Sequence, residues 1–118
     1  MRRARSLLLE SLEICRELKW EWEAAEVFEN LAIIEAWQAG TDRLKRAARL
    51  WGIAEMLSKV WGSMDRLEDS ESEIAAAREQ LGEEDFSSAW AEGGKMSFDQ
   101  AIAYAFESNV DTHRNADE

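Results

Sequence analysis

Residues 22–57, WEAAEVFENLAIIEAWQAGTDRLKRAARLWGIAEML, decide the fold. Apolar residues recur every three or four positions on both sides of Gly40, which is the spacing of helices with a buried face. Glycine adopts the left-handed conformation that ends a helix at little cost, so Gly40 predicts a turn. The stretch therefore predicts a helical hairpin, with one helix over 23–39 and another from Thr41–Asp42 to Val60.

Helical periodicity continues on both sides of this hairpin. Leu8, Leu12 and Cys15 recur at the spacing of a helix packed on one side over 3–18, and Leu7, Ile14 and Leu18 widen its apolar stripe. After a polar loop over 63–70, shorter helices are predicted over 71–81, 83–92 and 98–107. Because no stretch alternates apolar and polar residues convincingly, we expect no strands.

These elements predict an all-α fold of about six helices in a single domain over 1–107. The hairpin occupies 22–61, and a cap of shorter helices occupies 70–107. The segment 108–118 is polar and is expected to form a disordered tail. Proline breaks helix interiors, and its absence from the 118 residues agrees with this architecture.

Three local signals predict particular contacts. Gly52 lies inside a helix, where glycine costs about 1 kcal/mol relative to alanine, so we expect a neighbouring helix to approach it closely. Two segments, Ser70–Glu73 and Ser97–Gln100, have the sequence of a capping box at a helix N-terminus.

The net charge of −11 is unevenly distributed. Residues 65–118 carry fifteen acids and four bases, and this acidic half would repel nucleic-acid phosphates. Arg2, Arg3 and Arg5 could form a nucleic-acid arm, but we favour the solvated start of a helix. We therefore expect no direct contact with nucleic acid.

The cysteine count and the hydropathy of the sequence argue against an internal disulfide, a membrane-spanning segment and a signal peptide. Cys15 is the single cysteine, so no internal disulfide can form, and its place on an apolar stripe predicts a buried small side chain. The apolar stretches are too short to span a bilayer, and no signal peptide is recognisable. These features predict a cytoplasmic protein without a membrane segment.

Catalytic chemistry finds little support in the sequence. His113 is the single histidine, so a di-iron bundle, a zinc site and a catalytic triad are not expected. The run Gly93–Met96 lacks the hydroxyl of a phosphate loop and predicts a helix stop. The acids Glu83–Asp85 suit a helix N-terminus. We therefore expect no enzyme activity, no cofactor and no metal site.

Among the acids, Glu35 lies next to the apolar stripe of its helix. We expect it to pair with Arg46 or Arg49 across the hairpin, or to face solvent in an open groove.

Residues 22–60 resemble one tetratricopeptide (TPR) unit. Leu31-Ala32 stands where the repeat has a large residue followed by a small one, and Ala47 stands near the small position of the second helix. The interval from Gly40 to Ala47 is about two residues longer than in the usual repeat, which predicts an expanded turn.

The segments 45–57, 77–93 and 96–105 resemble the C-terminal repeat region of bacterial LuxR-type regulators and related STAND signal-transduction ATPases. The resemblance covers 3–107 and implies TPR-type hairpins that sense a signal or assemble with partners. It implies that ATP hydrolysis and DNA binding belong to other parts of such a regulator. It also implies that 3–18 is the second helix of a repeat whose first helix precedes it, leaving an apolar face that favours self-association.

Six tryptophans in this chain indicate a surface that binds a partner. Trp51, Trp61 and Trp90 are expected in the core. The residues expected to bind a protein or peptide partner, or a second copy of the chain as a homodimer, are Trp20, Trp22, Glu26, Asn30, Ile33 and Trp37. The alternative is a groove that binds a small effector and shifts the packing of the helices.

Overall fold

The structure is a computed structural model that describes residues 2–38, 40–60 and 70–117. Within these ranges the chain forms six α-helices, and the predicted all-α class is confirmed. The helices are α1 (Arg2–Leu18), α2 (Glu21–Gln38), α3 (Thr41–Val60), α4 (Glu71–Leu81), α5 (Glu83–Gly94) and α6 (Phe98–Asp117).

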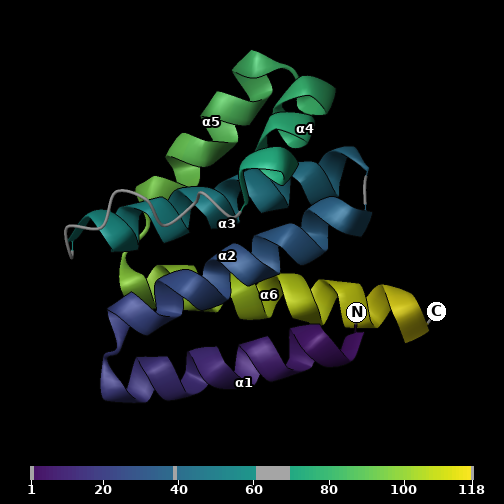
Figure 1. Cartoon of the computed structure of the whole chain (residues 1–118). Helices are drawn as coiled ribbons and strands as arrows, with labels where there is room; N and C mark the ends of the chain where they lie inside the picture. The colour runs from purple at the N-terminus through teal and green to yellow at the C-terminus, as the bar shows by residue number, and fades with distance from the viewer. Residues whose placement is uncertain (1, 39, 61–69, 118) are drawn as a thin grey trace.

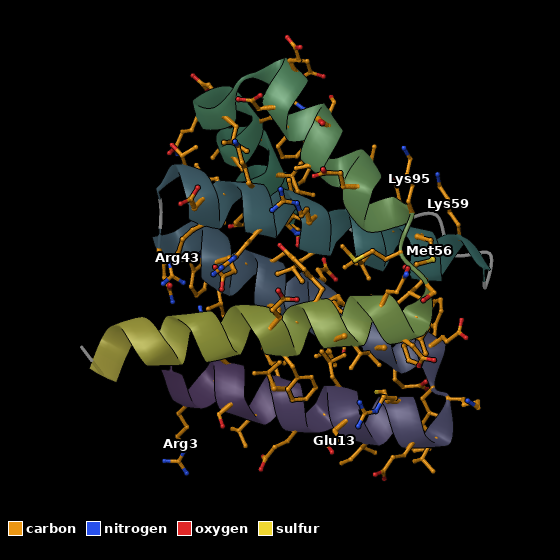
Figure 2. The ribbon with its side chains drawn as sticks, turned by 180° about the vertical axis from the view of Figure 1, so that it is seen from behind. Arg3, Glu13, Arg43, Met56, Lys59 and Lys95 are labelled. Atoms are coloured by element: carbon orange, nitrogen blue, oxygen red, sulfur yellow. The ribbon has the colours of Figure 1, made fainter. Side chains whose placement is uncertain are left out.

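The first three helices lie side by side and run antiparallel in chain order (Figure 1). The short helices α4 and α5 pack on the far side of α3, and α6 lies against α1 and α3. Seen from behind, α6 crosses in front of the layer formed by α1 and α2 (Figure 2). Helix α3 therefore contacts α2 on one side and α4 and α5 on the other, and it organises the domain.

The core fills the space between these helices. Its largest fully buried side chains include Phe28 of α2, Trp51 of α3, Phe86 of α5 and Ile102 of α6. The burial of Trp51 confirms the expectation for that residue. Trp90 is half-buried instead, and its indole nitrogen donates a hydrogen bond of 3.0 Å to Glu55.

The remaining core prediction, for Trp61, lies outside the described residues.

The turn from α1 to α2 closes without glycine. Lys19 adopts a left-handed backbone with φ of 59°, and the Trp20 amide donates to the Cys15 carbonyl at 2.8 Å. This bond supplies a donor to a carbonyl at the end of α1 that has no donor within the helix, as in a Schellman motif. The turn is therefore shorter than the one expected over 19–22, and α2 begins at Glu21.

Two glycines allow α3 and α5 to cross at backbone contact. A Cβ atom on Gly52 would meet the main-chain carbonyl of Trp90, and one on Gly93 would meet the carbonyl of Arg49. The expectation that a neighbouring helix approaches Gly52 closely is confirmed. Because both obstacles are backbone atoms, neither can move aside as a flexible side chain would.

One of the two expected capping boxes forms. The Ser97 hydroxyl accepts a bond from the Gln100 amide at 3.1 Å, and the Gln100 side chain accepts one from the Ser97 amide at 2.9 Å. The expectation for Ser70 is wrong, because its hydroxyl makes no cap bond and donates instead to Glu29 of α2 at 2.8 Å. A buried carboxylate therefore outcompetes the local cap, and the bond ties the start of α4 to α2.

Two predicted helix ends need correction. Helix α5 includes Gly93 and Gly94, because its glycines face α3 instead of ending the helix. Helix α6 continues to Asp117 through the segment where a disordered tail was expected from Ser108. That segment contains neither glycine nor proline, so nothing in its sequence stops the helix.

Replacing Gly93 with alanine tests the crossing of α3 and α5. Gly93→Ala is expected to lower the free energy of unfolding by about 2 kcal/mol, because the new methyl group forces two backbones apart. The matched control is Gly94→Ala, whose Cβ would lie at an ordinary 3.8 Å from the Gly52 carbonyl. Urea unfolding should show Gly94→Ala within about 0.5 kcal/mol of the parent. Equal effects of the two substitutions would contradict the proposed role of the crossing.

Candidate interaction surface

The residues expected to bind a partner lie along α2 and the turn before it. Trp22, Glu26, Asn30, Ile33 and Trp37 recur every three or four residues, so they share one side of the helix. They extend over about 22 Å of helix, which is longer than a single pocket. The structure therefore arranges them as a strip along α2, and it does not gather them at one point.

Burial divides this strip into different environments. Glu26 and Asn30 are exposed, whereas Trp22 is half-buried and Ile33 packs partly against the core. Trp37 has 62% of its surface exposed, which is the largest exposed fraction among the exposed large apolar side chains that the structure describes. The apolar surface that α2 offers to a partner is therefore concentrated at its C-terminal end.

Trp37 lines a hollow of about 240 Å³ between the α2–α3 hairpin and α4. Ala36 and Leu44 form the apolar wall of the hairpin, and Glu73 from α4 adds a carboxylate. The other lining residues are Ser72, Ala76, Ala77 and Gln80. The sequence did not reveal this hollow, because α4 lies far from Trp37 along the chain and no local pattern records their contact.

A second apolar surface lies on α1. Leu12 and Cys15 of the predicted stripe are buried against the rest of the domain, but Leu9 takes the place expected for Leu8, which is half-buried. Leu7 is 55% exposed, and Ile14 and Leu18 are each 51% exposed.

Trp20 continues this exposed surface into the turn and is 49% exposed. Helix α1 thus has more apolar surface than α2 and α6 cover.

A buried ion pair fastens α1 to α2. Arg5 lies 2.7 Å from one carboxylate oxygen of Glu35, and Arg43 lies 3.2 Å from the other. Both Arg5 and Glu35 are buried, and burial lowers the pKa of Arg5, partly against the attraction of Glu35. The interpretation of Arg5 as part of a solvated helix start is therefore wrong, because its side chain turns inward to a carboxylate.

Arg49, one of the two partners expected for Glu35, pairs elsewhere. Its guanidinium lies 3.0 Å from Glu92 of α5 and donates to the Tyr104 hydroxyl of α6 at 3.4 Å. Burial alone would lower the pKa of Arg49, but the hydrogen bonds and charges of Tyr104 and Glu92 together outweigh it, so this pKa is raised. The side chain therefore links α3 to α5 and α6 of the cap instead of reaching across the hairpin to Glu35.

Cys15 is buried, as expected. Burial raises the pKa of its thiol, and the negative charge of Glu23 raises it further. Because the thiolate is the reactive form, this environment suppresses nucleophilic chemistry at neutral pH.

Within the described ranges, no three histidine, cysteine or acidic side chains gather in a way that could hold a metal ion. None of the described helices is both long enough and apolar enough to cross a membrane.

Three known proteins are similar to part of this chain. They are described as putative HTH-type transcriptional regulators, two from strains of Mycobacterium tuberculosis and one from Mycobacterium bovis. Each is 46% identical to the chain over 47 residues, which is 40% of this chain and 5% of the regulator. No family model and no solved structure matches the chain. The chain therefore resembles a small segment of large bacterial regulators.

Removing Glu35 tests the buried ion pair. Glu35→Ala leaves Arg5 buried without its carboxylate, so the free energy of unfolding should fall by about 3 kcal/mol. The control is Glu13→Ala, which breaks a half-exposed pair with Arg16 at 3.6 Å and should cost less than about 1 kcal/mol. Chemical denaturation of both variants measures the difference, and similar losses would show that the buried pair does not fasten α1.

The thiol of Cys15 should react slowly while the chain is folded. Because its pKa is raised and its surface is buried, Ellman's reagent is expected to label it at least about tenfold more slowly in buffer than in denaturant. The denatured chain serves as the control, since it contains the same single thiol. Rapid labelling of the folded protein would mean that Cys15 is accessible.

Proposed function

We propose that this chain is a non-catalytic protein-interaction module of a bacterial transcriptional regulator. The observation that carries the proposal is the hollow beside Trp37, where an exposed indole ring and an apolar wall lie next to a carboxylate. The 46% identity to a segment of HTH-type regulators supports the biological setting. In this setting the module recruits or senses a partner while other parts of the regulator bind DNA.

The order of the first three helices supports a relation to TPR arrays of the LuxR and STAND type. Helices α2 and α3 form an antiparallel hairpin, and α1 packs on α2 as the second helix of a preceding repeat would. The helices α4 and α5 then cover the side of α3, and α6 returns to pack on α1. In such an array the exposed side of α2 belongs to the surface that receives a partner.

The chemistry of the Trp37 hollow favours a basic and aliphatic segment of a protein. The indole face attracts a cation, and the Glu73 carboxylate lies in the same hollow. Residues 71–94, which include α4 and α5, carry seven acids and one base, so they attract positive charge over a wider area. A lysine or arginine next to an aliphatic residue would satisfy both the carboxylate and the apolar wall.

A small effector is the alternative occupant, and the hollow supports it less well. Pockets for small ligands usually enclose about 300–1,000 Å³ and bury most of the ligand. The hollow beside Trp37 measures about 240 Å³, and four of the residues that line it are themselves exposed. A shallow surface of this kind suits a side chain presented by a protein better than a free small molecule.

Selection of random peptides displayed on phage tests this function. Peptides enriched on the purified chain should carry lysine or arginine beside aliphatic residues. Synthetic copies should bind Trp37→Ala about thirtyfold more weakly, as expected for an aromatic anchor worth about 2 kcal/mol. Fluorescence anisotropy with labelled peptides measures these affinities.

Trp20→Ala is the matched control, because Trp20 is also exposed but lies at the opposite end of α2. Trp20→Ala should bind the peptides with the affinity of the parent. Glu73→Lys should bind them more weakly. Peptides that bind Trp37→Ala and the parent equally, or the absence of any enrichment, would overturn the proposed role of this surface.

A further inference from the structure

Four exposed apolar residues of α1 form a regular stripe together with one serine. Ala4, Leu7, Ser11, Ile14 and Leu18 follow one another at alternating intervals of three and four residues. That spacing places them in a line along one side of a helix and is typical of a seam packed against another helix. All five belong to α1, four of them are exposed, and Ser11 is half-buried.

The charges around this stripe are balanced, although the chain as a whole carries −11. Among the described side chains from Arg3 to Lys19, those that are both charged and exposed are Arg3, Glu10, Glu13, Arg16, Glu17 and Lys19. Three are basic and three are acidic. Two copies of this acidic protein can therefore bring their α1 helices together without adding to their mutual repulsion.

We propose that a second copy of this chain packs on the α1 stripe, with the two helices antiparallel about a two-fold axis near Ser11. This axis places Leu7 of each copy opposite Ile14 of the other, and Ala4 opposite Leu18. The small side chains of Ala4 and Ser11 allow the helices to approach. The contact is self-complementary, as the interface of a two-fold dimer must be.

Charged residues beside the stripe are also compatible with a two-fold axis near Ser11. Arg3, Glu10 and Glu17 recur every seven residues and therefore lie on one flank of α1. In Figure 2 the labelled Arg3 extends from the edge of α1 that faces away from α6. In the antiparallel dimer Arg3 of each copy lies within one turn of Glu17 of the other, which gives two ion pairs. Glu10 lies near Glu10 of the partner, and this repulsion keeps the dimer weak.

Sedimentation equilibrium of the purified chain tests the dimer. The parent is expected to show a reversible monomer–dimer equilibrium. Ile14→Glu should weaken dimerisation at least about a hundredfold, because it places two carboxylates in an apolar seam. Ile14 is half-exposed in the monomer, so the circular dichroism and melting of this variant should match the parent. Glu10→Gln should strengthen dimerisation by removing the central repulsion.

A charge exchange tests the antiparallel register. Arg3→Glu alone and Glu17→Arg alone should each weaken the dimer about fivefold, whereas the double variant should restore it. The two residues are about 21 Å apart along α1, so restoration cannot arise within one copy. Restored affinity supports the register, and the absence of restoration overturns it.

Trp37→Ala separates this proposal from the function proposed above. It should leave dimerisation unchanged, because Trp37 lies outside the α1 stripe. A monomeric parent at every concentration, or a dimer unaffected by Ile14→Glu, would overturn the dimer without affecting the Trp37 surface. Loss of the dimer in Trp37→Ala would also overturn it, by assigning the contact to α2.

Discussion

The backbone contact between α3 and α5 is the constraint on which the arrangement of this domain depends. Gly52 and Gly93 remove two side chains at the crossing, so each helix meets the other helix's main chain. This close approach seals the core around Trp51 and allows Arg49 of α3 to reach Glu92 and Tyr104. Since α3 also packs on α2, the cap and the hairpin share one central helix.

Two buried carboxylates of α2 define how its neighbours attach. Glu35 holds Arg5 of α1 and Arg43 of α3, whereas Glu29 accepts a hydrogen bond from Ser70 at the start of α4. Burying such charges costs free energy that apolar packing does not, and partners at fixed positions compensate for that cost. Each of these polar contacts requires its partner at hydrogen-bonding distance. They therefore tie the positions of α1, α3 and α4 to that of α2.

The sequence predicts the local features of this fold well, but it predicts contacts between residues far apart along the chain poorly. The starts of the helices, the turn at Gly40 and the packing role of Gly52 follow from periodicity and glycine placement within a few residues, whereas the end of α6 does not. The partners of Arg5 and Ser70 do not, because both are determined by residues of α2 far along the chain. For the candidate surface, the tryptophans of α2 could be named in advance. The hollow beside Trp37 could not, because α4 forms one of its walls.

The uneven distribution of charge affects how the protein meets other molecules before any contact forms. The α4–α5 hairpin, which carries seven acids and one base, lies at the opposite edge of the molecule from α1 (Figure 1). A basic protein diffusing nearby is drawn toward this edge, so encounters are oriented and not random. The rate of such encounters falls as dissolved ions screen the attraction. The ionic composition of the surroundings thus governs how fast α4 and α5 collect basic molecules, while collisions through the α1 edge, where exposed charges balance, depend on it less.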